Sequence, residues 1–429
     1  AKRILENSKS REALVKEVEK KEVRKPAPFP FDLGTLQTEA YRIFGFIPKK
    51  TQQIAQTLYE GGYISYPRTS SPKLPHAIGY ERILRSLREA VEFRDYADAV
   101  LKKEMPKPRE GPKSDPAHPA IYPTGILPKA LSREAEELYK LIVHRFFAVF
   151  GEPLIREAVN VLCEIGREAF KFSGETTVEE GWNKLYPYIA FKEVEVPALK
   201  TGDILPVLKL YSSEKETQPP ARFNPASLVK ELEKRGLGTK ATRAEIIDTL
   251  YQREYIRRTQ IETTELGNAV IAALEENVPA IISEELTRRF EERLENIQNG
   301  RESKESVLEE AKKELSRIMN EFKQKEKLIG EKLVKALEEK NRRKYVVGVC
   351  KCGGDLRIIK SKATGKIFIG CSNYPKCSTS YPLPQREGVR TTDKKCSTCG
   401  LPMVSIPFRR KRFLSCIDMN CKSKSAKRF

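Results

Sequence analysis

The sequence predicts a multidomain α+β protein, in which helical units alternate with an antiparallel β module and two small cysteine-rich modules end the chain. Three observations support this prediction. Residues 35–67 and 224–267 both have the order helix, turn, helix, strand; residues 153–215 consist largely of short β-type runs; and all cysteines except Cys163 lie in two clusters after residue 345. A length of 429 residues gives room for about two to four domains.

The first residues are strongly charged and predict one helix, or a helix that leads into a strand. We assign residues 1–30 to the end of a preceding β segment. Because residue 1 is not methionine, we expect an N-terminal truncation, a split gene or an incomplete sequence.

Residues 31–150 predict a winged-helix-like domain. Apolar side chains at helical spacing define a first helix that Gly45 ends, and Pro48 fits the first turn of a second helix. The second helix stops at a Gly-Gly pair, and the run YISYP after it predicts a short strand. Further helices follow, interrupted by a proline-rich loop that we expect to be ordered because it contains the apolar run AIYPTGIL.

Residues 151–220 predict an antiparallel sheet module, with the runs AVNVLCEI, EAFKFSG, EVEVPALK and ILPVLKLYSS as its strands. Residues 221–344 return to helix and repeat the order helix, glycine-containing turn, helix, strand pair. A long charged helix at residues 301–343, solvated on most faces, completes this predicted helical domain.

The charge of the chain favours a polyanionic partner. Lys and Arg number 79 against 59 Asp and Glu, which gives a net charge of +20 and a pI near 9.4. The ion-pair-rich surface of a thermophilic protein is the alternative explanation, but it accounts for the number of charges and not for their imbalance. No stretch approaches the roughly 20 apolar residues of a membrane span, and no secretory signal opens the chain. We therefore expect a nucleic acid partner, a cytoplasmic location and no membrane.

The two cysteine clusters have the spacing of metal sites. The first has C-x-C, 18 residues and C-x5-C, and the second has C-x2-C, 16 residues and C-x4-C. Four soft ligands in two close pairs suit tetrahedral Zn²⁺, so we predict structural zinc ribbons at residues 345–383 and 391–429. A four-cysteine iron–sulfur cluster is the alternative. The predicted ligands are Cys350, Cys352, Cys371 and Cys377 in the first ribbon and Cys396, Cys399, Cys416 and Cys421 in the second.

The second ribbon alternates basic and aromatic residues in the run IPFRRKRFLS, on a predicted strand. Arg409, Arg410 and Arg412 can neutralise phosphates while the phenylalanines stack on bases, which suits single-stranded DNA. A purely structural role is the alternative, because so small a module has no core without its metal.

The segment YEGGYISYPRTSSPKLP, residues 59–75, contains three tyrosines, and Tyr66 has an arginine two residues on. In an extended chain Tyr66 and Arg68 share a face and can address one phosphate, with Thr69 and Ser70 as further donors. A phenol attacks phosphorus only if a cation favours the phenolate and the phosphate charge is neutralised. Arg68 can neutralise the phosphate charge and can help to favour the phenolate. From residue types alone, packing along a strand is the more frequent role of such tyrosines.

This segment closely resembles the active-site segment of type IA DNA topoisomerases, in the form seen in archaeal topoisomerases I and III. Residues 30–46 resemble the family's lead into its tyrosine domain, residues 117–125 its histidine motif, and residues 232–247 the helical segment that lines its DNA channel. The resemblance covers roughly residues 20–300, and many family members carry appended zinc ribbons like these.

The resemblance implies that Tyr66 is the nucleophile of a 5′-phosphotyrosine link, that Arg68 assists at the scissile phosphate, and that His118 positions or protonates groups near the site. Tyr59 and Tyr63 match no catalytic position and are assigned to packing. DNA contacts are implied at a predicted helix start, for Gly238, Thr239, Lys240, Thr242 and Arg243. The alternative for His118 is a structural role. The alternative for the turn at residues 238–243 is an ordinary helix cap by Thr239.

The resemblance also assigns the domains: a tyrosine domain, a β gate or hinge module at residues 151–220, and a DNA-binding helical domain. One family element is missing. The family carries a Toprim domain ahead of this region, with an acidic cluster for Mg²⁺, and this chain shows no Asp-x-Asp cluster of that kind. We expect Mg²⁺ in the complete enzyme through residues absent from this chain, and expect the chain alone to be inactive.

The implied function is transient cleavage of one DNA strand, strand passage and religation without ATP, which relaxes negatively supercoiled DNA. The absence of a G-x4-GK[ST] loop agrees with the lack of ATP. We expect single-stranded and negatively supercoiled DNA as partners of a monomer in the nucleoid. The alternatives are a non-catalytic DNA-binding fragment or paralogue, and the topoisomerase part of reverse gyrase.

Overall fold

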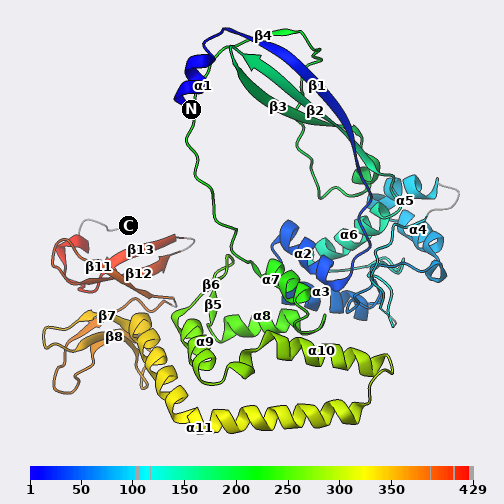
Figure 1. Ribbon diagram of the computed structural model, residues 1–429. Helices are drawn as coiled ribbons and strands as arrows, with labels where there is room; N and C mark the ends of the chain where they lie inside the picture. Colours follow the sequence, from blue (N-terminus) through cyan, green and yellow to red (C-terminus); the bar gives the residue numbers. More distant parts are fainter. Residues whose placement is uncertain (103–106, 116, 387, 409–410, 425–429) are drawn as a thin grey trace. The chain divides into compact units, whose positions relative to one another are not determined.

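The computed structural model divides the chain into two compact units, residues 1–250 with 258–261, and residues 251–257 with 262–429 (Figure 1). The structure describes residues 1–102, 107–115, 117–386, 388–408 and 411–424, and for residues 342–344 the backbone alone.

A four-stranded antiparallel sheet forms one part of the first unit. Its order is β3 (Glu168–Glu179), β2 (Leu154–Ile165), β1 (Glu12–Lys25) and β4 (Ile204–Pro206). The short helix α1 (Lys2–Asn7) precedes β1, so the helix-to-strand alternative is confirmed for the start of the chain. β1 pairs with β2 along almost its whole length, which joins the two β segments expected at residues 1–30 and 151–220 into one sheet.

Two of the four predicted strands in this module are wrong or shorter than expected. The run EVEVPALK contributes only a bridge between Val194 and Glu175, and the run ILPVLKLYSS contributes only β4. Pro197 and Pro206 interrupt these runs, and proline cannot donate to a strand ladder.

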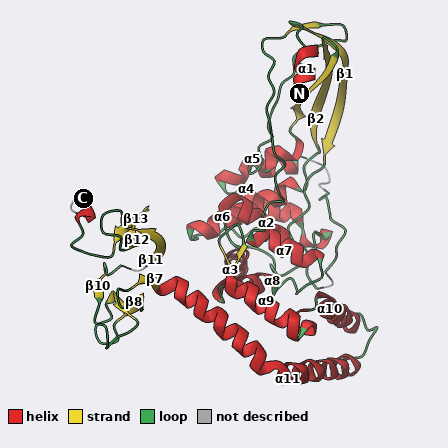
Figure 2. Cartoon of the chain, turned by 60° about the vertical axis from the view of Figure 1, so that its left-hand side comes forward, coloured by secondary structure: helices red, strands yellow, loops and turns green. Residues whose placement is uncertain are grey.

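A helical cluster forms the other part of the first unit and contains its largest core (Figure 2). Its helices are α2 (Leu33–Phe44), α3 (Pro48–Glu60), α4 (Tyr80–Arg88), α5 (Arg94–Leu101) and α6 (Arg133–Ala148). Short 3₁₀ turns lie at His76–Ile78, Val91–Phe93 and Gly181–Leu185. α6 is buried on most of its surface, so the other helices pack around it.

The local signals of the sequence explain where α2 and α3 begin and end. Asp32 and Thr35 form a capping box at the start of α2, and Gly45 ends it with φ of 72°. Pro48 occupies the first turn of α3, as predicted. The strand predicted at YISYP is wrong, because only Ile64 forms a bridge, and its partner Pro123 has no N–H to extend the ladder.

The predicted second helix–turn–helix–hairpin order is confirmed. In the first unit α7 (Pro225–Lys234) packs beside α2 and α3. Ion pairs join α8 (Arg243–Gln252), whose last two residues belong to the second unit, to α3. The hairpin β5 (Ile256–Arg257) and β6 (Glu262–Thr263) belongs to the second unit. The second unit continues with α9 (Glu265–Asn277), the 3₁₀ turn Pro279–Ile282, α10 (Glu284–Gln298) and the long α11 (Lys304–Tyr345). α11 packs on α9 through a small apolar core that includes Ile318 and Ile329.

Two small antiparallel sheets hold the cysteines. The first has the order β10 (Ser380–Pro382), β9 (Ile367–Cys371), β8 (Asp355–Lys360), β7 (Val346–Val349). The second has the order β11 (Arg390–Lys395), β12 (Pro402–Phe408), β13 (Lys411–Cys416), and the 3₁₀ turn Lys422–Lys424 follows it. The two sheets share one apolar core, in which Leu356 and Ile369 of the first join Val404 and Ile417 of the second. None of the helices in the described ranges combines the length and apolar character that a membrane span requires.

The stability of the helical cluster should depend on pH through His144. This buried imidazole lies among the rings of Phe93, Tyr96 and Phe147. Burial lowers its pKa, and the contact of Nδ1 with the Leu185 carbonyl oxygen, at 3.2 Å, offsets this only in part. Below pH of about 6.5 the unfolded chain therefore takes up a proton before the folded chain, and the free energy of unfolding falls by at most about 1.4 kcal/mol per pH unit.

Denaturant unfolding between pH 5 and 7.5 measures this slope, with the single tryptophan, Trp182, reporting from the same core. We expect His144→Phe to flatten the slope, whereas replacing the exposed His76 by Asn should leave it unchanged. Equal slopes in the parent chain and in His144→Phe would contradict the assignment.

Candidate active site and metal centres

Hydrogen bonds fasten the tyrosine segment to the loop that contains the histidine motif. The Ser65 backbone N–H donates to the Tyr122 carbonyl oxygen at 2.9 Å, and the Tyr122 N–H donates to the Ser65 hydroxyl at 3.0 Å. The Ser65 hydroxyl in turn donates to the Ala120 carbonyl oxygen at 2.9 Å. At the ends of the segment, the N–H groups of Thr124 and Ala120 donate to the carbonyl oxygens of Tyr63 and Lys73. The segment is therefore held in place without being part of a sheet.

Tyr66 and His118, predicted from separate motifs, are in contact. The two half-buried rings have centroids 4.5 Å apart. Tyr59 is 40% exposed and packs edge-on against Tyr66, with ring centroids 5.2 Å apart. Tyr63 packs on Tyr139 at 6.4 Å, as expected. Of the three tyrosines, Tyr66 alone lies beside the motif histidine.

Arg68 supplies a half-buried cation two residues after Tyr66. Its Nε is buried and has no hydrogen-bond partner in the part of the chain that the structure describes. A buried donor without a partner is costly, and it commonly marks a place where a ligand or ion completes the site. An anionic oxygen would satisfy this donor.

Thr69 and Ser70 are held inside the protein. Thr69 is buried, and its hydroxyl donates to the His118 carbonyl oxygen at 3.2 Å. The Ser70 N–H and hydroxyl both donate to Oδ2 of Asp115, each at 3.3 Å. Both residues thus fix the loops around Tyr66, which is a role that the sequence alone did not assign to them.

Asp115 was not among the predicted site residues. Its Oδ2 also accepts from the Lys240 ammonium, and its Oδ1 accepts from the Ala117 N–H at 3.1 Å. Burial raises the pKa of Asp115, but the Lys240 ammonium and the N–H groups of Ala117 and Ser70 outweigh burial and lower the pKa to about 2. The signal in the sequence is an acidic residue three positions before the motif histidine.

The predicted DNA-contact turn lies immediately before α8. Gly238 has φ of 64°, and a Cβ there would come within 3.2 Å of the Thr242 hydroxyl. The Thr239 N–H donates to that hydroxyl at 2.9 Å, so Thr242 orders the turn. The Arg243 guanidinium Nε donates to the Leu237 carbonyl oxygen at 3.1 Å.

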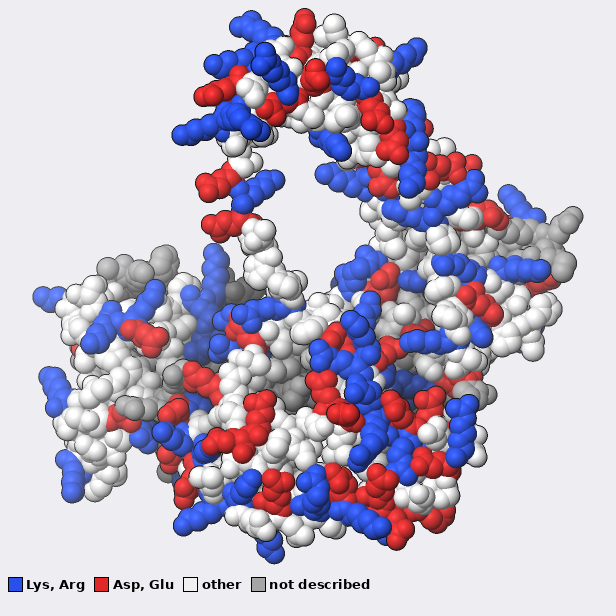
Figure 3. All heavy atoms as spheres, in the orientation of Figure 1, with Lys and Arg blue, Asp and Glu red and all other residues white. Residues whose placement is uncertain are grey.

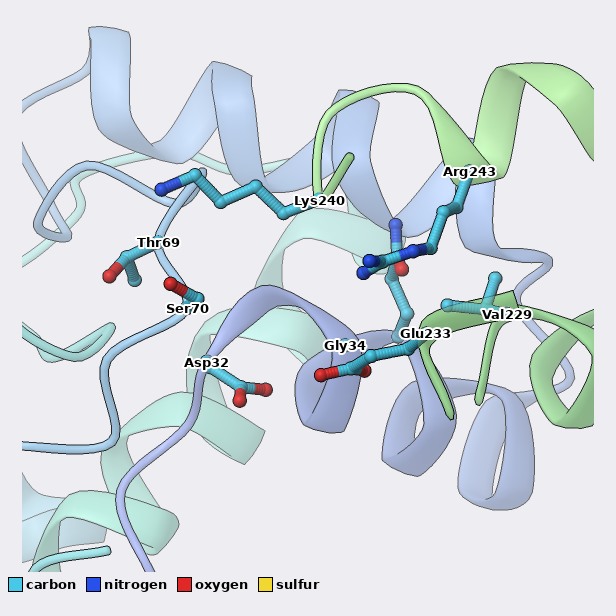
Figure 4. Close-up of a pocket in the computed structure, with 9 residues that line it drawn as sticks. Asp32, Gly34, Thr69, Ser70, Val229, Glu233, Lys240 and Arg243 are labelled. Atoms are coloured by element: carbon cyan, nitrogen blue, oxygen red, sulfur yellow. The ribbon is translucent and has the colours of Figure 1, made fainter. Parts of the chain in front are cut away.

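A cavity of about 290 Å³, which includes open solvent and is lined mostly by polar residues, joins this turn to the tyrosine segment (Figure 4). Figure 4 shows Lys240 extending toward Thr69 and Ser70, while Glu233 points toward Gly34 at the start of α2. Burial raises the pKa of Asp32 in the cavity wall, although hydrogen bonds from Thr35 oppose this. The cavity is lined by Asp32, Gly34, Gln37, Thr69, Ser70, Val229, Glu233, Lys240 and Arg243.

Each cysteine cluster brings its four sulfur atoms within 4.8 Å of one another. Tetrahedral zinc with Zn–S bonds near 2.3 Å needs sulfur atoms about 3.8 Å apart. The Sγ atoms of Cys350 and Cys377 are 3.8 Å apart, and those of Cys352 and Cys371 are 3.3 Å apart. The corresponding distances in the second cluster are 3.7 and 3.4 Å. Both donor sets therefore fit zinc. Gly353 and Gly400 take positive φ in the turns that follow the first cysteines of each set.

The basic strand of the second ribbon is only partly described, because Arg409 and Arg410 lie outside the described residues. The Arg412 guanidinium donates to the Gly388 and Ser405 carbonyl oxygens, at 2.7 and 2.9 Å, so it is engaged within the ribbon. Phe408 and Phe413 lie 5.7 Å apart across the hairpin, and the Arg386 guanidinium covers the Phe408 ring at 4.8 Å. Figure 3 shows Lys and Arg across the whole visible face, interspersed with Asp and Glu.

Comparison with known proteins identifies two family matches. Residues 1–309 match the family described as DNA topoisomerase, and residues 347–386 and 393–427 match the family described as topoisomerase DNA binding C4 zinc finger. Each ribbon thus holds a four-cysteine zinc site.

Curated relatives match nearly the whole chain. DNA topoisomerase 1 of Pyrococcus horikoshii is 49% identical over 99% of this chain and 63% of the relative, and that of Methanothermobacter thermautotrophicus is 46% identical over 99% and 58%. This chain therefore spans about three fifths of their length. The solved structure of full-length topoisomerase I from Thermotoga maritima has a similar fold, with a TM-score of 0.62 at 24% identity over 92% of this chain and 63% of that one.

We expect two zinc ions per chain by native mass spectrometry. Replacing Cys350 and Cys352 together by serine should remove one ion, because two thiolate ligands do not hold zinc tightly. Cys163→Ser is the matched control and should retain both ions, since Cys163 is buried in β2 and belongs to neither four-cysteine set. Bound iron, or a mass that shows cysteine disulfides in place of zinc, would contradict the assignment.

Proposed function

We propose, from the premise that this chain belongs to the type IA DNA topoisomerase family, that it is the tyrosine-bearing part of an enzyme that cleaves and rejoins single DNA strands. One observation carries the proposal. Tyr66 lies against His118, in a loop whose Arg68 has a buried, unpartnered guanidinium nitrogen among the described residues. In attack on a phosphodiester, a phenol can act as the nucleophile, an imidazole can position it or transfer a proton, and a cation can neutralise the phosphate.

In the proposed reaction the Tyr66 phenol oxygen attacks the scissile phosphorus. The bond from the phenol oxygen to phosphorus forms, the bond from phosphorus to the 3′ oxygen breaks, the phenol proton leaves and the 3′ oxygen takes up a proton. Arg68 neutralises the phosphate, and His118 positions the phenol ring through direct contact. Because the product is still a phosphodiester, the reverse reaction reseals the strand without ATP.

We assign DNA contacts to two groups of residues. Lys240 and Arg243 place two cations beside the cavity that ends at Thr69 and Ser70, and the Phe408–Phe413 pair offers rings on which bases can stack. Within the complete enzyme we propose relaxation of negatively supercoiled DNA, with strand passage through a gate formed by the β module at residues 151–220. We further propose that the enzyme is a monomer in the cytoplasmic nucleoid.

We also propose that the complete enzyme uses Mg²⁺ through a Toprim half that this chain does not include. The relatives are longer than the chain, and within the described residues only the two cysteine sets have metal-ligand spacing. When bound, Mg²⁺ would supply positive charge at the scissile phosphate.

Tyr66→Phe in the complete enzyme should abolish covalent adducts with single-stranded DNA, because the ring stays while the nucleophilic oxygen is lost. Denaturant trapping followed by gel electrophoresis of labelled DNA measures the adduct. Arg68→Lys should lower adduct formation about 100-fold, since a point charge replaces a planar donor pair. The exposed Tyr59→Phe is the matched control and should cleave normally. Adducts in Tyr66→Phe would refute the proposal, whereas DNA binding by every variant without any adduct would favour the non-catalytic alternative.

The isolated chain should bind single-stranded DNA but relax no supercoils. If three or more phosphates contact Lys or Arg, affinity should fall at least about tenfold between about 50 and 200 mM salt. Phe413→Ala should weaken binding by about 1–3 kcal/mol through lost stacking, while Phe172→Ala, with a similarly exposed ring, should have no effect. Fluorescence anisotropy measures both. Relaxation by the isolated chain would show that the Toprim half is dispensable.

A further inference from the structure

One buried carboxylate connects the three segments of the proposed site. Oδ2 of Asp115 accepts from the Ser70 N–H and hydroxyl and from the Lys240 ammonium, while Oδ1 accepts from the Ala117 N–H. Ser70 lies two residues after Arg68, Ala117 directly precedes His118, and Lys240 lies in the turn before α8. The side chain of Asp115 is 4% exposed, so nearly all its contacts are with protein.

The chemistry of these contacts requires an ionised acid. Four donor groups converge on two oxygen atoms, and a carboxylate is the side chain that accepts from all of them without offering a proton. An amide of the same shape would turn an N–H₂ group toward the Lys240 ammonium or toward the backbone donors. The contacts fix both loops relative to one another in a region where regular strands are absent.

We propose that Asp115 is a positioning residue, which aligns the Tyr66 loop and the His118 loop with the Lys240 turn for the cleavage step. The proposal rests on the proposed function. An ammonium has three donors, so Lys240 can keep its contact with Asp115 and still donate to a phosphate oxygen. Asp115 would then act on the geometry of the reacting groups and only weakly on DNA affinity.

A second ion pair tethers α8 to the same helical cluster and provides a matched control. The Lys49 ammonium of α3 contacts Asp248 at 2.6 Å and Glu245 at 3.1 Å, both on α8. The Lys49 ammonium makes its described ion pairs with α8, whereas the Asp115 carboxylate contacts the tyrosine segment, Ala117 and Lys240. Removing Lys49 thus weakens the packing of α8 without disturbing the loops.

The test compares Asp115→Asn, Lys240→Met and Lys49→Met in the complete enzyme. Hydrogen–deuterium exchange without DNA follows peptides that cover residues 63–73, 117–124 and 237–243. Single-turnover adduct formation at saturating single-stranded DNA gives the cleavage rate, and anisotropy gives the affinity. We expect Asp115→Asn to speed exchange in all three peptides and slow cleavage at least about tenfold, since small misplacements of reacting groups cost that much. Its affinity should stay within about threefold.

The other two variants distinguish the Asp115–Lys240 contact from the ion pairs of Lys49 with α8. Lys240→Met should speed exchange mainly at residues 237–243 and weaken DNA binding, because it removes a cation but leaves the Ser70 and Ala117 contacts. Lys49→Met should leave the exchange of residues 63–73 and the cleavage rate at parent values.

Two results for Asp115→Asn would overturn the proposal: unchanged exchange at residues 63–73, or a loss of affinity that parallels the loss of rate. The proposed function has its own test, because it fails if Tyr66→Phe still forms adducts. The exchange data decide in either case whether Asp115 holds the loops in place.

Discussion

The hydrogen bonds between the tyrosine segment and the histidine loop are the constraint on which the proposed site depends. Both stretches are rich in proline, so neither can complete a strand ladder, and backbone groups that are buried need partners. The hydroxyls of Ser65 and Thr69 and the carboxylate of Asp115 supply those partners. As a result Tyr66 meets His118 although the sequence provides them in separate motifs. Thr69 and Ser70, which the sequence suggested as phosphate donors, thus also hold the loop of Tyr66 in place.

The helical elements around these loops provide the rigid support. α6 is buried in the largest core, and α2 begins beside the loop, where the Leu33 N–H donates to the Thr69 carbonyl oxygen at 3.0 Å. By contrast, α7 and α8 contact this cluster partly through ion pairs such as Lys49–Asp248, which are weaker and sensitive to salt. An element held by ion pairs can separate more easily than one held by an apolar core, because water and salt compete for the charges. The two zinc ribbons lie in the second unit and share one apolar core, while each has its own set of four cysteines.

Much of this organisation could be predicted from the sequence. Helix boundaries at Gly45 and Pro48 followed from local capping rules, and the cysteine spacing identified both metal sites. The strand at YISYP was predicted wrongly because proline in the partner segment decides the pairing, and that partner is distant in sequence. Asp115 was missed for the same reason: its role arises only from contacts with Ser70 and Lys240, which local patterns cannot reveal.

The central claim is that Tyr66, and neither of its neighbouring tyrosines, becomes joined to DNA. Mass spectrometry of the trypsin-digested adduct of the complete enzyme tests it most directly, because one tryptic peptide, residues 51–68, contains Tyr59, Tyr63 and Tyr66 together. Fragmentation of that peptide should place the nucleotide mass on Tyr66 alone, linked through a 5′ phosphate. A nucleotide on Tyr59 or Tyr63, or on a peptide elsewhere in the enzyme, would contradict the account.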